Sequence, residues 1–172
     1  MGLFLEKGFR ATTMENIVSR VTLSKGGVYR LYPSTEAILQ DLILEGMRLR
    51  NQFYADQAEQ YQHLTLKDVI RMVVESLLVQ EEFSRIYVEF LWEKQRSPSL
   101  EALYQQICQV SMEETKTLIR SCGAEELLLA DEGCLERLTD LMNTAILGIR
   151  VLGLDFAGNR EKITEAIFQM MQ

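Results

Sequence analysis

The sequence predicts an all-α protein with an N-terminal helix-turn-helix and a C-terminal helical domain. Among its 172 residues only two are proline, Pro33 and Pro98, and they interrupt long stretches of helical periodicity. No run of alternating apolar and polar residues between turn signals indicates a sheet. The composition, 47% apolar and 25% charged, is that of an ordinary globular protein. The chain turns polar from Asp56 to Thr65, so we expect a DNA-binding domain with its connecting helix over residues 1–54 and a second domain over 55–172.

The stretch from Thr12 to Leu39 contains three helix starts, each opened by a hydroxyl residue that can accept the unpaired amide hydrogens of a first turn. Thr12 with Glu15 has the spacing of a capping box. Ser24 starts a second helix, and Pro33 ends it because proline has no amide hydrogen and disfavours helical geometry in the preceding residue. Ser34 caps a third helix. This order predicts a helix, a short turn and a helix.

The start of the second helix is the tetrapeptide Ser24-Lys25-Gly26-Gly27. A helix-turn-helix inserts this part of its second helix into the major groove of DNA, while the flanking helix ends hold the backbone. The two glycines lower helix propensity by about 1 kcal/mol each relative to Ala, which is unexpected in a helix that only packs against its own domain. Close approach to a phosphate or a base edge would explain this cost.

The charge distribution also bears on a DNA partner. A net charge of −7, spread evenly, would argue against nucleic-acid binding. Through Pro33, however, the chain carries five basic and two acidic residues, a net charge of +3, so the remainder carries −10. A basic segment on an acidic body is typical of a local DNA-binding surface. A split this small also occurs in other proteins and decides nothing alone.

At these residues the sequence resembles the tetracycline-repressor (TetR) family of bacterial transcription regulators. The matching pieces keep the family's order and spacing: Leu3-Phe4, Gly8-Phe9, Thr12-Thr13, Ile17, Leu23-Ser24-Lys25-Gly26-Gly27-Val28-Tyr29, and Tyr32-Pro33-Ser34-Thr35-Glu36 with Leu39. Three positions depart from the family: Thr22 replaces a glycine of the turn, Tyr32 a phenylalanine, and Thr35 a lysine that contacts phosphate. The family's first helix also begins well before its Leu-Phe pair, so we expect a shortened first helix here.

The resemblance implies DNA-binding roles for ten residues. Ser24, Lys25 and Gly26 would approach bases or phosphates, and most of the others would hold the backbone. Arg30 could reach DNA or lie in solvent. The expected DNA-binding residues are Thr12, Thr13, Ser24, Lys25, Gly26, Gly27, Tyr29, Arg30, Tyr32 and Thr35.

By the same resemblance, the middle helices would enclose a pocket for a small-molecule effector. Periodicity predicts these helices over residues 66–80, 83–95 and 99–122. The large aromatic or adaptable residues available to line a pocket, with Glu89 as a polar anchor, are Met72, Tyr87, Phe90, Trp92 and Tyr104. The same residue types at helical spacing also form ordinary core.

The segment from Gly133 to Leu154 becomes apolar nearly all round, and such a helix needs burial on two sides. A last helix from Asn159 carries one apolar stripe. In the family, the final two helices of two subunits form a four-helix bundle, and these segments look like that pair. The expected dimer-interface residues are Leu141, Ala145, Gly148, Leu152, Ile163, Ile167 and Met170.

Support for an enzyme, a metal site or a cofactor is lacking. His63 is the only histidine, and Cys108, Cys122 and Cys134 lack CxxC spacing, which excludes the usual zinc frameworks. With only His63 to serve it, we find no candidate Ser–His–Asp set. We expect these cysteines to be small buried apolar residues in a reducing cytoplasm, with redox sensing as the alternative. No segment has the about 18 apolar residues of a membrane span.

The sequence therefore predicts a bacterial one-component transcription regulator, a repressor that binds palindromic operator DNA as a homodimer and is released by a small-molecule effector. The alternative is a dimeric helical ligand sensor or interaction protein, without productive DNA binding because its first helix is short. A helical-bundle enzyme is a third, weaker interpretation.

Overall fold

The computed structural model describes residues 1–58, 64–79, 81–121, 133–153 and 157–171, and over these residues the chain is all-α, as predicted. Two short 3₁₀ turns, Lys94–Arg96 and Ala157–Asn159, accompany the α-helices. The helices are α1 (Gly2–Lys7), α2 (Met14–Val18), α3 (Lys25–Leu31), α4 (Thr35–Ala58), α5 (Leu66–Val79), α6 (Glu81–Glu93), α7 (Pro98–Ser121), α9 (Cys134–Leu152) and α10 (Arg160–Met170).

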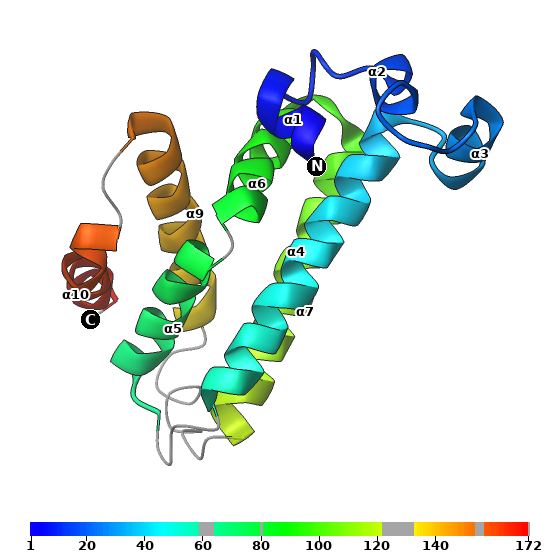
Figure 1. Ribbon diagram of the computed structural model, residues 1–172. Helices are drawn as coiled ribbons and strands as arrows, with labels where there is room; N and C mark the ends of the chain where they lie inside the picture. Colours follow the sequence, from blue (N-terminus) through cyan, green and yellow to red (C-terminus); the bar gives the residue numbers. More distant parts are fainter. Residues whose placement is uncertain (59–63, 80, 122–132, 154–156, 172) are drawn as a thin grey trace.

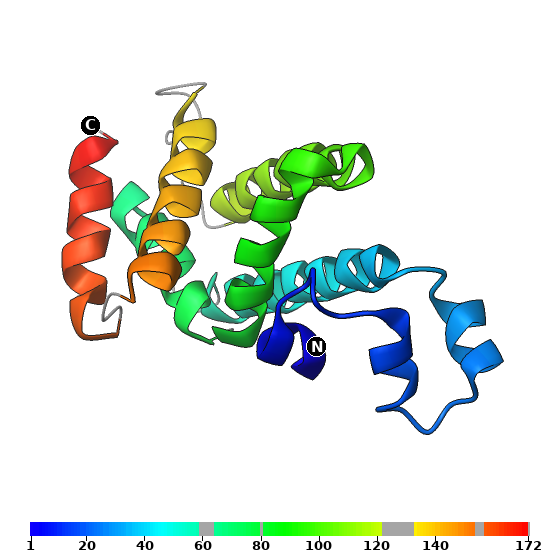
Figure 2. The same cartoon turned by 90° about the horizontal axis from the view of Figure 1, so that it is seen from above.

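The long helices α4 and α7 lie side by side and form the axis of the molecule (Figure 1). We call residues 1–34 the head, and α5 to α10 the body. Helices α2 and α3 extend from one end of α4, whereas α1 lies against α6 of the body. Helices α9 and α10 lie on the side of the molecule away from α3 (Figure 2). Helix α4 thus connects the head to the body.

Two clusters of buried residues form the core. One joins α1, α4, α6 and α7 through Phe4, Leu39, Ile43, Ile86, Phe90, Leu100 and Ile107. The other joins the far end of α4 to α5, α7, α9 and α10, and includes Tyr54, Val69, Ile70, Met72, Ile119, Leu138, Met142 and Ile167. Because Phe4 lies in the first cluster, part of the head shares its core with the body.

Two of the three predicted helix caps are confirmed. Ser24 Oγ accepts the Gly27 amide at 3.1 Å at the start of α3, and Ser34 Oγ accepts the Ala37 amide at 3.1 Å at the start of α4. Helix α4 is longer than predicted and remains helical through Ala58, with Gln52 donating to Asp56 one turn later at 2.8 Å.

The predicted capping box at the start of α2 was wrong by one residue. The capping residue is Thr13, whose hydroxyl accepts the Asn16 amide, while the Asn16 side chain accepts the Thr13 amide. Thr12 cannot fill this role because its hydroxyl lies inside the head, where it donates to Gly8 O at 2.9 Å.

The remaining predicted helices agree with α5, α6, α7, α9 and α10 to within about two residues at the described ends. The predicted helix over residues 99–122 ends at the border of the described residues, since residues 122–132 lie outside them. The predicted domain boundary at residues 54 and 55 falls within α4 and stays a prediction.

Candidate nucleic-acid interface and ligand cavity

The helix-turn-helix leaves most of the predicted DNA-binding residues at the surface. Gly27, Tyr32 and Thr35 are half-buried, and Thr12 is buried, with 4% of its surface exposed. Thr12 is therefore in no position to contact DNA in this conformation, since its hydroxyl serves the head's own backbone. The exposed members are Thr13, Ser24, Lys25, Gly26, Tyr29 and Arg30.

Hydrogen bonds fix α3 against both of its neighbours. The Tyr29 hydroxyl donates to Glu15 of α2 at 3.3 Å, and Lys25 Nζ lies 5.9 Å from the centre of the Tyr29 ring. The Tyr32 hydroxyl donates to Asp41 of α4 at 2.6 Å, and this hydrogen bond raises the pKa of Tyr32. The orientation of α3 is therefore coupled to the first turns of α4.

Gly26 is not required by the packing of the chain itself. A Cβ at this position would meet no atom of the described residues within 4 Å, and Gly26 does not have the positive φ that favours glycine. Gly26 thus lowers the helix propensity of the first turn of α3, although no packing contact among the described residues requires a glycine there. The close approach to DNA predicted from the sequence would account for this cost.

The positive charge of the head is smaller at its surface than the sequence suggests. Arg20 pairs with Glu6 at 2.9 Å, and its hydrogen bond lowers the pKa of Glu6. Arg10 pairs with Glu93 of the body at 2.6 Å, and this hydrogen bond raises the pKa of Arg10. Lys25 and Arg30 are the basic residues exposed on α3 itself.

The head is docked on α6 through two carboxylates. Glu89 Oε2 accepts the Phe9 amide at 3.1 Å, just after Gly8 turns the chain with a φ of 80°, and Glu93 binds Arg10. We call these two interactions the docking contact. Glu89 was predicted to be a polar anchor of the effector pocket, and this prediction is corrected, because its carboxylate accepts the Phe9 amide of the head.

Replacing Glu89 by Ala is expected to loosen the docking contact. The variant loses the acceptor of the Phe9 amide, and because a hydrogen bond to a charged group contributes about 1.5–3 kcal/mol, that amide should exchange with solvent about tenfold faster or more. Hydrogen–deuterium exchange read by NMR measures this. Glu82→Ala, an exposed carboxylate on the same helix, is the control. An unchanged Phe9 exchange rate would show that the contact does not hold the head.

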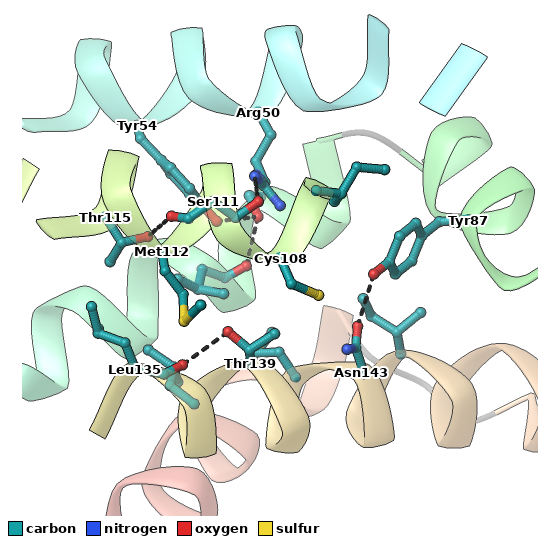
Figure 3. A pocket seen from close by; sticks show the side chains of 16 residues that line it. Arg50, Tyr54, Tyr87, Cys108, Ser111, Met112, Thr115, Leu135, Thr139 and Asn143 are labelled. Atoms are coloured by element: carbon teal, nitrogen blue, oxygen red, sulfur yellow. Dashed lines mark hydrogen bonds between the residues drawn. The ribbon is translucent and has the colours of Figure 1, made fainter. Parts of the chain in front are cut away.

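A cavity of about 100 Å³ lies in the body between α4, α5, α6, α7 and α9 (Figure 3). A second, of about 80 Å³, adjoins it and shares Arg50, Ser76, Tyr87, Ile107 and Ile146. Arg50 and Tyr54 reach the first cavity from α4, Ser111 and Cys108 from α7, and Asn143 from α9. Burial raises the pKa of the Cys108 thiol, which favours the unreactive protonated form over a redox-sensing thiolate.

The comparison with known families now identifies the head. The family model for the bacterial regulatory proteins of the TetR family matches residues 1–42, which contain α1, α2, α3 and the first turns of α4. Residues 1–42 thus match the DNA-binding domain of that family, and the match supports a TetR-family transcription regulator with a DNA-binding helix-turn-helix. Among curated proteins, no match to the chain is found.

Of the six predicted pocket residues, one lines the two cavities described above. That residue is Tyr87, whose hydroxyl donates to Asn143 Oδ1 at 3.1 Å. Met72 and Phe90 are buried core residues, and Trp92 points outward with 59% of its surface exposed. Tyr104 lies behind the wall, where its hydroxyl accepts from Asn143 at 3.1 Å. Periodicity identified the buried faces but not the part of each face that borders a cavity.

Sequence reasoning missed Arg50, the charged residue of the cavity wall. A signal for it exists in the spacing of Ile43, Met47, Arg50 and Tyr54, which puts the arginine on the same face of α4 as three residues that pack inward. A charged side chain on such an inward-facing position points into the protein and not into solvent.

The predicted dimer-interface residues divide into two groups. Ile167 is 2% exposed and lies in the chain's own core, and Leu141, Ala145 and Ile163 pack against that core, so Ile167 is corrected to a core residue. Leu152 and Met170 are exposed, at 71% and 58%. Gly148 has no described atom within 4 Å of the position of a Cβ.

The described residues contain no cluster of three or more His, Cys, Asp or Glu side chains that could hold a metal ion. No described helix is long and apolar enough to cross a membrane.

Proposed function

We propose that this TetR-family regulator is a repressor that binds a palindromic operator as a homodimer and leaves it when a small-molecule effector occupies the cavity of the body. The observation that carries the proposal is the course of α4. This helix begins directly after the helix-turn-helix and continues without a break to Arg50 and Tyr54 at the cavity.

Two helices can transmit the state of the cavity to the head. Helix α4 carries Arg50 at the cavity and Asp41, which binds Tyr32 of the head. Helix α6 carries Tyr87 at the cavity and, two residues later, Glu89 of the docking contact. An effector that favours a different position of either helix changes the orientation of the head. It lowers operator affinity only to the extent that it binds the two arrangements differently.

The packing of α4 against α6 supports a coupled movement. A Cβ on Gly46 of α4 would lie 2.9 Å from Cδ1 and 3.3 Å from Cβ of Phe83 on α6. The two helices are therefore in close contact next to the cavity. A displacement of one would be passed to the other, because a packed interface has no free space to absorb it.

The homodimer is supported by exposed apolar residues of α9 and α10. Val151, Leu152 and Met170 are exposed large apolar side chains at the ends of these helices. A dimer would cover them, and its two-fold axis would match a palindromic operator with half-sites about 34–36 Å apart, or a multiple of that distance. One helix-turn-helix alone binds DNA weakly.

A DNase I footprint on the DNA upstream of the protein's own coding region tests this function. We expect protection of one two-fold symmetric sequence, and reduced transcription from a promoter that overlaps it. A folded dimer that protects no sequence would contradict the proposal. The release mechanism fails separately if the effector-saturated dimer holds its two heads at the spacing of the DNA-bound form, measured between spin labels on α3.

One observation favours the alternative, a dimeric helical sensor or interaction protein without productive DNA binding. Val21, Leu23 and Leu31 of the head are exposed, at 42%, 51% and 59%, so α3 is held to the head by few apolar contacts. Such a head would lose its structure at lower temperature than the body. Ligand binding by the cavity with no protected DNA sequence would support this alternative.

A further inference from the structure

The chemistry of the cavity indicates the class of ligand that it takes. Arg50 is the one charged side chain among the described residues that line the two cavities. Its Nη2 donates to Ser111 Oγ at 2.8 Å, and its guanidinium carbon lies 5.7 Å from the centre of the Tyr54 ring. Its buried Nε has no hydrogen-bond partner among the described residues.

The other polar groups of the wall are already paired. The hydroxyls of Thr115 and Thr139 donate to the backbone carbonyls of Ser111 and Leu135 at 2.8 Å (Figure 3). The Ser76 hydroxyl donates to the Val73 carbonyl at 2.7 Å. Asn143 uses both ends of its amide, one for each of two tyrosine hydroxyls. The wall therefore presents to a ligand an apolar surface with one charged group, the guanidinium of Arg50, whose Nε lies just beneath that surface without a partner.

We propose that the cavity binds a small apolar monocarboxylate, with its carboxylate on the guanidinium of Arg50. A buried donor without a partner is costly, and Arg50 is a half-buried cation, hence an anion at this point is favoured. Nε and Nη2 form one edge of the guanidinium, the edge at which carboxylates accept two parallel hydrogen bonds. The single positive charge matches a monoanion, and the apolar wall disfavours a dianion such as phosphate.

The walls and the volume define the remainder of the ligand. Met112, Met142, Leu135, Leu138 and Ile146 surround the space beyond Arg50, and thioether side chains adapt to irregular apolar groups. The two adjoining cavities, of about 100 and 80 Å³, compare with the roughly 150 Å³ of an engineered cavity that admits benzene. A single aromatic ring or a short alkyl chain fits this size.

This inference rests on the proposed function only in naming the ligand an effector; the ligand class follows from the cavity itself. The probes are benzoate and hexanoate, each compared with its neutral amide, on the full chain without DNA. Calorimetric titration should give saturable binding of at least one carboxylate, with an affinity about tenfold or more above that of its amide. Equal binding of acid and amide, or no saturable binding by either carboxylate, would overturn the proposal.

Three variants assign the binding to Arg50. Arg50→Met keeps the length of the side chain and should lower carboxylate affinity about tenfold or more while leaving amide binding unchanged. Arg50→Lys keeps the charge but removes Nε, and it should lose part of the affinity; it replaces Arg50→Met if that variant does not fold. Arg48→Met is the matched control, because Arg48 is exposed on the same helix and pairs with Glu45. Unchanged carboxylate affinity in both Arg50 variants would contradict the assignment.

The ligand class and the proposed function can fail independently. A carboxylate that binds through Arg50 but leaves operator binding unchanged would uphold the ligand class and contradict effector release. A chain that protects an operator but binds neither carboxylate would uphold DNA binding and contradict the ligand class.

Discussion

Leu152→Asp is expected to give a monomeric protein that has lost high-affinity operator binding. Leu152 ends α9 with 71% of its surface exposed, next to the exposed Val151. A carboxylate there would have to be buried in the proposed dimer interface without a partner, which is strongly unfavourable. Because two linked binding sites gain about 10²–10⁴ in affinity over one, we expect operator affinity to fall about a hundredfold or more.

Sedimentation velocity and fluorescence anisotropy measure the two effects on the same sample. Val110→Asp is the matched control, since it makes the same kind of change at an exposed apolar residue of α7, outside the proposed interface. We expect that variant to remain dimeric and to bind the operator normally. A Leu152→Asp protein that stays dimeric would contradict the assignment of this surface, whatever its affinity for DNA.

Gly26→Ala is expected to stabilise the free protein and to weaken its binding to DNA. The added methyl group meets no described atom within 4 Å, and Ala favours a helix over Gly by up to about 1 kcal/mol, so the melting temperature should rise. If Gly26 makes room for a phosphate or a base edge, the same methyl group should lower operator affinity about tenfold or more.

Gly2→Ala is the control for this pair of effects. Gly2 also lies in the first turn of a helix with no described atom near the position of a Cβ, but in α1 rather than α3. It should gain stability without losing DNA affinity. Normal operator affinity in Gly26→Ala would show that this glycine does not face DNA, and the close-approach argument would then be wrong.

The helix starts of the head were predictable where a hydroxyl residue acts within its own first turn. Ser24 and Ser34 cap α3 and α4 as their spacing predicted. Thr12 does not cap α2 as predicted, because the turn at Gly8 brings a carbonyl oxygen to its hydroxyl. The capping residue is Thr13 instead. A sequence pattern records the spacing along the chain but not an acceptor that the tertiary structure brings near.

The cavity was less predictable than the helices that surround it. Met72, Phe90 and Tyr87 all lie on buried faces, but only Tyr87 lies where neighbouring helices leave space. The positions of such gaps depend on how three or more helices cross, which periodicity in one helix does not contain. Glu89 was misassigned for a related reason, since its partner is a backbone amide 80 residues away.

The salt dependence of operator binding tests the central claim, that α3 holds DNA through its exposed basic residues. Fluorescence anisotropy on the protected sequence should give a logarithmic affinity that falls linearly with logarithmic salt. Lys25 and Arg30 from two subunits predict a slope of about −3.6. Lys25→Gln should reduce its magnitude by about 1.8, and Lys116→Gln on α7 should leave it unchanged. A folded dimer with no preference among duplexes, or a slope that Lys25→Gln does not change, would contradict the account.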